Sequence, residues 1–221
     1  MTLKSSPETW PSGHLARLLT VYAADPARAA LALAIDERLA GALRAAREPI
    51  IAAIRLAWWR DVLVKDDVSK GHGEPLVAAW RAWQPDESAR EHVDDLIDGW
   101  SALADPDAPA RATADAFSCH RGGGLFALLT GDSSPPMQAA GRLWSLWDLA
   151  AHVEDEELAQ TAMETASEAL AIAHPLPKTA ISRPARLALA IALPDIRSGR
   201  LPQKGFSLRH YLRLLKAAFL D

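Results

Sequence analysis

Residues 48–63 read EPIIAAIRLAWWRDVL, and this stretch decides how the rest of the chain is interpreted. Pro49 favours a helix start, because proline suits the first turn of a helix. The apolar side chains that follow would cover most of the circumference of such a helix: Ile51, Ile54, Leu56, Trp58, Val62 and Leu63. This pattern predicts a central, largely buried helix over residues 50–64. Its two arginines, Arg55 and Arg60, must then face partners or a cavity.

The two adjacent tryptophans of this stretch allow two interpretations. Neighbouring side chains on a helix point about 100° apart, so one of Trp58 and Trp59 can fill the core while the other lines a groove. In a structural role, Arg60 pairs with Asp61 or with a carboxylate on the next helix. In a functional role, the same helix lines a ligand cavity with Arg55, Trp58, Trp59 and Arg60. The residues by themselves favour packing.

Composition favours an all-helical protein. Ala accounts for 44 of the 221 residues, whereas Tyr and Phe together number six. This balance favours helix over sheet and excludes a β-sandwich or a β-barrel. The formal net charge is −4 and Lys and Arg are scattered, so the chain lacks the basic patch of a nucleic-acid-binding protein. The single cysteine excludes an internal disulfide and a thiolate zinc site.

We expect a cytoplasmic protein. The N-terminal residues MTLKSSPETWPSGH contain no apolar signal core, and no apolar stretch reaches the roughly 18 residues that span a bilayer. A peripheral membrane contact remains open. Five residues give the C-terminal third a basic bias: Lys178, Arg183, Arg186, Arg197 and Arg200. They fit an anionic lipid surface, although we favour a simple role in solubility.

Proline, glycine and capping residues divide the chain into helical segments joined by short connections. Asp25-Pro26, for example, is typical of an N-cap followed by the first helical residue. We expect helices over residues 15–24, 26–47, 50–64, 74–83, 85–104, 108–129, 137–153, 156–173, 186–196 and 208–220. No linker is long enough to separate two domains, so we expect a single all-α domain over residues 1–221, with residues 1–13 flexible.

The sequence Arg121-Gly122-Gly123-Gly124 interrupts an alanine-rich segment. Three glycines cost about 2–3 kcal/mol of helix propensity relative to alanine, which predicts a break or a close helix crossing. The run lacks the GK[ST] ending of a phosphate-binding loop, so we favour close packing. We expect the neighbouring Cys119 to be a small buried residue rather than a nucleophile.

The block RLAWWRD after Glu48-Pro49 resembles the squalene and phytoene synthase family, and more closely its divergent branch, which includes the mitochondrial complex I assembly factor of that family. Three further stretches follow in the family's order: CHRGGGLFALL (119–129), AAGRLWSLWDLAAHVEDE (139–156) and PLPKTAISRPARLALAI (175–191). The resemblance covers residues 25–215. It implies a helical bundle like that of the isoprenoid synthases, with the helix that contains Trp58 and Trp59 near its centre.

Active members of the family bind Mg²⁺ with two aspartate-rich helical motifs, because the departing diphosphate needs its charge neutralised. In place of the first motif, this chain has Asp36-Glu37 followed by Ala40 and Gly41. In place of the second aspartate pair, it has His152 and Glu156, with Asp148 where the family carries a polar amide. Both motifs are therefore degenerate, and the resemblance implies a protein without prenyl-synthase activity, catalytic residues, metal or cofactor.

Our first hypothesis is accordingly an assembly or interaction factor, or a binder of an isoprenoid or lipid. Its candidate cavity and ligand residues are Arg55, Trp58, Trp59, Arg60, Asp148 and His152. The alternative is a prenyltransferase that condenses isoprenyl diphosphates with Mg²⁺ at a site rebuilt from Asp148, His152, Asp155 and Glu156. A third hypothesis is an adaptor that presents exposed tryptophans to a protein partner, with Trp10, Trp80, Trp83 and Trp100 as candidates. The DDxxD sequence of Asp94 to Asp98 is most simply a solvated helix face.

Overall fold

The computed structural model describes residues 14–46, 48–173, 176–203 and 207–219, and all regular structure within them is helical. The expected all-α class is confirmed, with no strand in these ranges. The predicted flexibility of residues 1–13 concerns residues outside them. The α-helices are α1 (His14–Tyr22), α2 (Pro26–Arg44), α3 (Pro49–Leu63), α4 (Pro75–Trp83), α5 (Glu87–Ser101), α6 (Ala110–Thr130), α7 (Pro135–His152), α8 (Glu156–Ala173), α9 (Arg183–Ser198) and α10 (Leu208–Phe219), with a short 3₁₀ helix, η2 (Lys178–Ala180).

Side-chain caps fix several of the helix starts. Asp25 accepts hydrogen bonds from the backbone N–H groups of Ala27 (3.0 Å) and Arg28 (3.1 Å), so α2 begins where the sequence predicts. Asp86 caps α5 in the same way, so this helix begins two residues later than the predicted start at 85. Ser182 caps α9, which begins three residues earlier than predicted.

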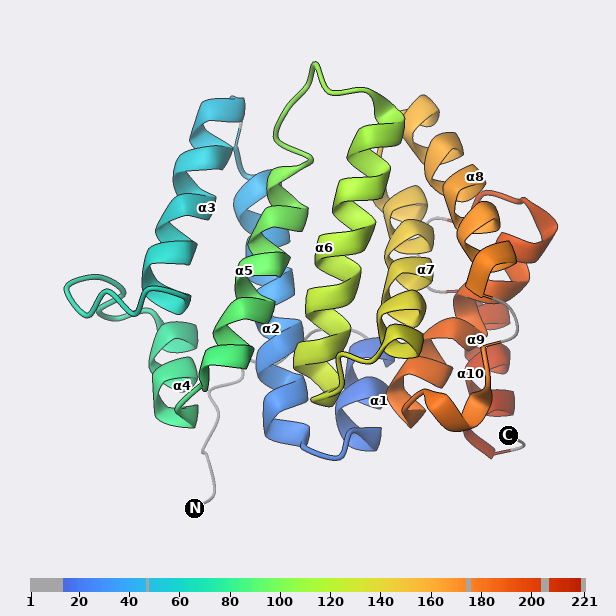
Figure 1. The fold of residues 1–221 in the computed structure, drawn as a ribbon, viewed down its shortest axis with the longest axis horizontal. Coiled ribbons are helices and arrows are strands. Elements are labelled where there is room, and N and C mark those ends of the chain that lie inside the picture. The colour runs from blue at the N-terminus through green and yellow to red at the C-terminus, as the bar shows by residue number, and fades with distance from the viewer. Residues whose placement is uncertain (1–13, 47, 174–175, 204–206, 220–221) are drawn as a thin grey trace.

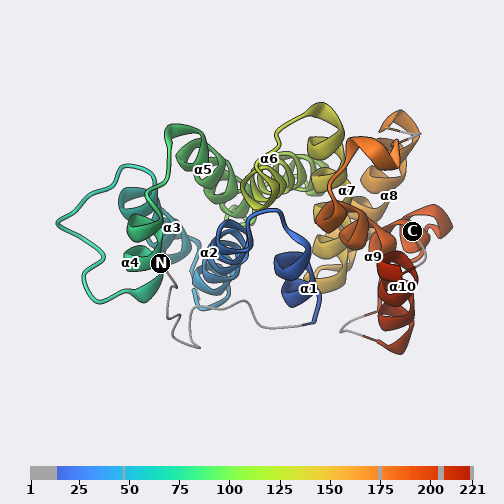
Figure 2. The ribbon, with the colours of Figure 1, turned by 90° about the horizontal axis from the view of Figure 1, so that it is seen from below.

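The helices form two layers, which Figure 2 shows end-on. Helices α5, α6, α7 and α8 follow one another in the first layer, and each packs against the next. Helices α3, α4, α2, α1, α9 and α10 form the second layer. Helix α2 packs against α5 and α6 across the interface, and α9 packs against α7. Helix α6 lies in the middle of the first layer (Figure 1), which makes it the element around which the buried core is built.

The glycine run is a close crossing and not a break, because α6 continues through it. A Cβ added at Gly122 would lie 2.5 Å from the carbonyl oxygen of Gly141 on α7, and one added at Gly124 would lie 2.6 Å from the carbonyl oxygen of His92 on α5. On the α5 side, a Cβ at Gly99 would lie 2.5 Å from the backbone nitrogen of Arg121. Glycine is therefore what allows α5, α6 and α7 to approach so closely.

The prediction that α3 is central and largely buried is wrong. This helix lies at one edge of the molecule (Figures 1 and 2), and Ile50 and Ile54 are about 60% exposed. Five residues are enough to dock it on its neighbours: Ala52, Leu56, Trp59, Val62 and Leu63. Apolar residues on all sides of a helix do not identify the side that is buried, and here the outward side stays apolar.

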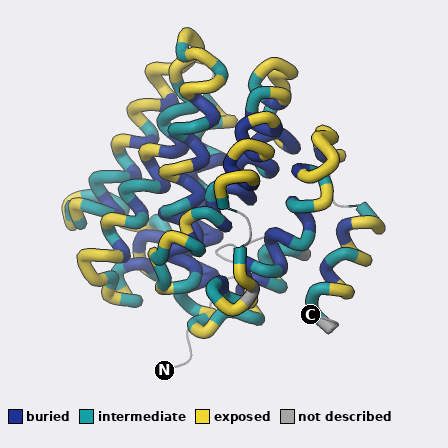
Figure 3. Tube along the Cα trace, turned by 45° about the vertical axis from the view of Figure 1, so that its right-hand side comes forward, coloured by how far each residue is buried: buried dark blue, intermediate teal, exposed yellow. Residues whose placement is uncertain are grey.

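Two of the tryptophans considered as interface residues belong to the core. Trp80 is fully buried and donates a hydrogen bond from Nε1 to the carbonyl oxygen of Leu63 (2.9 Å), and Trp100 is also buried. Trp83 is partly buried, and Trp10 lies outside the described residues. The exposed positions fall mainly on outward helix faces and connections (Figure 3). Among the described helices, none is long and apolar enough to cross a membrane.

Candidate functional site

Arg121 lies at the centre of α6 and is buried, with only 4% of its side chain exposed. It is the only Lys, Arg, Asp or Glu between Asp115 and Asp132, in a stretch whose inward side forms core. The glycine contacts described above bring α5 and α7 against this part of α6. The guanidinium therefore points into the interior, where a charge is costly unless it is paired.

Two carboxylates from different helices hold this guanidinium. Nε and Nη2 of Arg121 donate to Oδ1 (2.8 Å) and Oδ2 (2.7 Å) of Asp36 on α2. Nη1 lies 2.9 Å from Oδ2 of Asp148 on α7. The Asp36 pair is bidentate, the geometry that a planar guanidinium favours. One arginine thus links three helices, and we call Asp36, Arg121 and Asp148 the buried triad.

Aromatic rings enclose the triad. Trp100 on α5 donates from Nε1 to Oδ1 of Asp36 (2.8 Å), and its ring lies 4.8 Å from the guanidinium carbon of Arg121. The rings of Phe117 and Trp144 lie 5.1 and 4.9 Å from the same carbon. These distances are within the range of cation–π interactions. The rings pack around the guanidinium between α5, α6 and α7.

The outer end of the triad carries a titratable histidine. Nδ1 of His152, which is mostly exposed, lies 3.3 Å from Oδ1 of Asp148. Burial alone would raise the pKa of Asp148, but the charge of Arg121 and the hydrogen bond with His152 outweigh burial and hold the pKa of this carboxyl below its ordinary value of 3.8. The same hydrogen bond raises the pKa of His152 above its ordinary value of 6.5.

This coupling predicts a pH dependence of stability. A raised pKa in the folded state means that His152 stabilises the fold fully below its ordinary pKa, and that this contribution is lost as the pH rises through the folded-state pKa. We expect the melting temperature of wild type, relative to a His152→Gln variant, to fall as the pH is increased from about 6 to 8.5. Equal pH profiles for the two proteins would contradict the coupling. Burial lowers the pKa of His210 in both proteins, so the difference isolates His152.

Every oxygen of the two carboxylates faces a donor. Oδ1 of Asp36 receives Arg121 and Trp100, and Oδ2 receives Arg121 again. Oδ2 of Asp148 faces Arg121, and Oδ1 faces His152. A Mg²⁺ ion needs unpaired carboxylate oxygens, and here it would have to displace a buried cation. The donor set of the triad therefore does not fit a metal ion.

The other two residues of the rebuilt magnesium site, Asp155 and Glu156, are not bonded to the triad. Asp155 caps α8 by accepting hydrogen bonds from the N–H groups of Glu157 (2.9 Å) and Leu158 (3.1 Å), and Glu156 is exposed in the first turn of that helix. Carboxylates in this position favour the positive end of the helix dipole. Within the described ranges, no group of three or more His, Cys, Asp or Glu side chains is arranged to hold a metal ion.

The four candidates on α3 lie apart from the buried triad. Arg60 pairs with two carboxylates on α5, Asp94 (2.5 Å) and Asp98. They are the first and last residues of the DDxxD sequence. Arg55 donates to the carbonyl oxygen of Ala42 (3.3 Å). None of these residues bonds to the buried triad.

The two tryptophans of α3 divide their roles as expected. Trp59 is buried in the core, and Trp58 is partly exposed, with its ring edge-on to Trp59 at a centroid distance of 4.8 Å. Packing explains both residues. Sequence reasoning missed the pairing of Asp36 with Arg121. The signal available was the isolation of one charge within an apolar helix.

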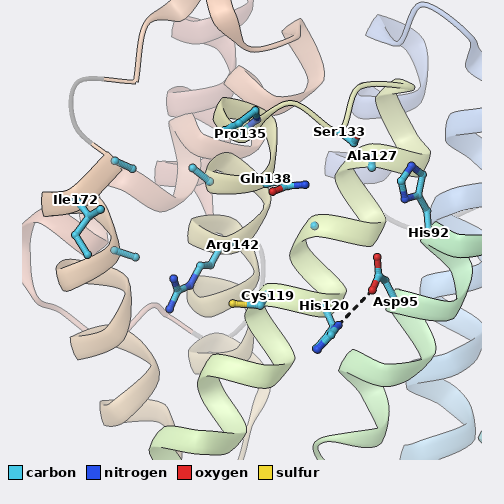
Figure 4. Close-up of a pocket in the computed structure, with 14 residues that line it drawn as sticks. His92, Asp95, Cys119, His120, Ala127, Ser133, Pro135, Gln138, Arg142 and Ile172 are labelled. Carbon is cyan, nitrogen blue, oxygen red and sulfur yellow. Dashed lines mark hydrogen bonds and ion pairs between the residues drawn. The ribbon is translucent and has the colours of Figure 1, made fainter. Parts of the chain in front are cut away.

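An open groove of about 440 Å³ crosses the outer surface of α5–α8 (Figure 4). Cys119 is exposed there, so its predicted burial is wrong, because it lies on the opposite side of α6 from the core. Its sulfur points away from His120, whose Nδ1 lies 3.2 Å from Oδ1 of Asp95. The groove thus contains an imidazole–carboxylate pair without a thiol beside it.

In comparisons with protein-family models, curated proteins and solved structures, nothing matched this chain.

Proposed function

We propose that this protein is a non-catalytic relative of the squalene and phytoene synthases, with a bundle like that of the isoprenoid synthases, and that it acts by binding a partner protein as an assembly or interaction factor. The all-helical architecture is consistent with this proposal. The observation that carries it is Arg121. The two carboxylates that it joins are Asp36, in the degenerate first motif, and Asp148, one helical turn before the residues that replace the second aspartate pair.

The chemistry of the family explains why this arrangement points away from catalysis. Ionisation of an allylic diphosphate develops negative charge on the leaving group, and divalent cations between opposed carboxylates stabilise it. In this protein, a guanidinium that belongs to the chain neutralises Asp36, which stands in the first motif, and Asp148, which stands where the family carries a polar amide. A fixed internal cation satisfies the electrostatics of the fold but leaves no free carboxylate in the triad for the metal ions that would bind the diphosphate.

The filled centre favours a partner protein over an isoprenoid held inside the bundle. The rings of Trp100, Phe117 and Trp144 occupy the space around Arg121. The outer surface, in contrast, offers an apolar helix face on α3, where Ile50 and Ile54 are 60% and 59% exposed. Exposed apolar side chains grouped on one helix face are typical of protein-interaction surfaces.

The proposal predicts the outcome of a ligand assay. Thermal unfolding of the purified protein is followed with farnesyl diphosphate, with and without Mg²⁺, while released diphosphate is measured in parallel. Tight binding to the native state would raise the melting temperature. We expect no such Mg²⁺-dependent rise and no diphosphate release. An active squalene or phytoene synthase in the same assay is the positive control.

Diphosphate release that is lost in an Asp148→Asn variant would overturn the proposal and favour the prenyltransferase. Mg²⁺-dependent stabilisation by the diphosphate without turnover would instead favour an isoprenoid-binding role. Both results are distinct from a misfolded preparation, which circular dichroism identifies by loss of the helical signal.

A further inference from the structure

Helix α10 presents an apolar stripe to solvent. Its sequence is LRHYLRLLKAAF, and four large apolar residues recur at the spacing of one helix face: Leu208 (74% exposed), Tyr211 (47%), Leu212 (57%) and Leu215 (37%). At 100° per residue, these positions lie within about 100° of one another around the helix. The helix therefore has one apolar face that no described part of the protein covers.

The opposite face of α10 is fixed to the body of the protein. His210 and Leu214 are buried, and the ring of His210 lies edge-on to that of Trp147. Arg213 donates to the carbonyl oxygen of Ile191 (2.9 Å) and to Oδ1 of Asp195 (2.9 Å), both on α9. Because these contacts set the rotation of α10, the exposed stripe is a defined surface of the fold. Figure 2 shows the helix at the corner of the molecule, with α9 beside it.

Cationic side chains run along one edge of the stripe. Arg209 and Lys216 are exposed, and neither forms an ion pair with another described residue. The charge extends along the chain, because residues 196–220 contain six Lys and Arg and no Asp or Glu, although the whole protein has a net charge of −4. Arg200 and Leu201, which is 48% exposed, line the same pocket as Arg209 and so continue the surface at the start of the helix.

A helix with an apolar stripe bordered by cations matches the interface of a membrane with anionic lipids. The apolar side chains enter the boundary between headgroups and acyl chains, and the cations remain beside the lipid phosphates. On α3, in contrast, Asp61 follows Ile50 and Ile54 on the same side, and Arg60 is paired with Asp94 and Asp98. We propose that α10, with Arg200 and Leu201, is a docking surface for an anionic membrane and holds this protein at the bilayer surface. This inference is independent of the proposed function.

The test is cosedimentation of the full chain with lipid vesicles. We expect binding to vesicles of phosphatidylcholine with about 30% phosphatidylglycerol, much weaker binding to phosphatidylcholine alone, and weakening by salt. An Arg209→Gln/Lys216→Gln variant should bind about 30-fold more weakly, since each cation near the surface contributes about 5-fold. A Leu208→Gln/Leu212→Gln variant should lose about a hundredfold or more, because two large apolar side chains no longer enter the lipid.

The matched control is Ile54→Gln, which removes an apolar side chain of nearly equal exposure (59% against 57% for Leu212) from α3. It should bind vesicles as wild type does. Three results would overturn the inference: no binding of wild type to anionic vesicles, equal binding to neutral vesicles, or equal losses from the control and the α10 variants. Light scattering after gel filtration tests another occupant. A dimer that the Leu208→Gln/Leu212→Gln variant dissociates would assign the stripe to a second copy of the chain and likewise overturn it.

Discussion

Replacing Arg121 with Met should lower the free energy of unfolding by about 3–5 kcal/mol, because it leaves two carboxylates without their cation in the core. Asp36 would lose both hydrogen bonds of its bidentate pair, and Asp148 would keep only His152. Urea denaturation followed by circular dichroism measures the change. The unfolding free energy of Arg121→Lys should lie between those of wild type and Arg121→Met, since an ammonium keeps the charge but cannot form the bidentate pair.

Arg111 provides the matched control. It also joins two carboxylates, Asp115 (2.9 Å) and Glu168 (2.7 Å), but half of its side chain is exposed. Arg111→Met should therefore change stability only slightly, because water and salt screen the pairs. If Arg111→Met and Arg121→Met were equally mild, burial would not decide the strength of the triad.

A triple variant separates the loss of pairing from the loss of packing. When Asp36→Asn and Asp148→Asn accompany Arg121→Met, no charge of the triad remains unpaired, so the triple variant should be more stable than Arg121→Met alone. A further loss of stability on adding the two Asn substitutions would show that the carboxylates stabilise the fold without Arg121, contrary to the arrangement described.

Adding a single methyl group at the crossing of α6 and α7 should also destabilise the protein strongly. In Gly122→Ala, the new Cβ would lie 2.5 Å from the carbonyl oxygen of Gly141, and in Gly141→Ala it would meet the carbonyl oxygen of Gly122. Backbone atoms cannot rotate away as the end of a side chain can, so the helices must separate. We expect each variant to lose about 1–3 kcal/mol or more of unfolding free energy.

The neighbouring glycine gives the opposite expectation. A Cβ at Gly123 meets nothing within 4 Å, and this residue is in the same helix. Gly123→Ala should therefore stabilise the protein by about 0.5–1 kcal/mol through helix propensity alone. Thermal or urea unfolding of the three variants checks both signs. Destabilisation by Gly123→Ala, or a gain of stability from Gly122→Ala, would show that the crossing is not set by these contacts.

Local sequence signals predicted most of the helices and the reason for the glycine run. Asp25-Pro26 located the start of α2, and the glycines beside Arg121 indicated close packing. Both signals act over a few residues, through capping bonds and the space a side chain needs. The burial of α3 was predicted wrongly because apolar residues on every side of a helix carry no information about which side meets the core.

The candidate site shows the same division. The resemblance placed Asp36 in the degenerate first motif and Asp148 where the family carries a polar amide, but the acidic residues alone did not reveal the cation that is their partner. That partner is Arg121, 85 residues from Asp36, and only the packing of α2, α6 and α7 brings the three side chains together. Closeness in sequence was equally uninformative: Cys119 and Arg121 are two residues apart on one helix, yet Cys119 is exposed and Arg121 is buried.

The sequence by itself therefore determined that this chain forms helices, where most of them begin and end, and where two of them can approach closely. The tertiary structure alone decided which charges are neutralised in the core and which apolar faces remain exposed, as on α3 and α10. The physical reason is range. Helix propensity, capping and glycine spacing act within one turn of the chain, whereas burial and ion pairing depend on neighbours that folding brings from distant parts of it.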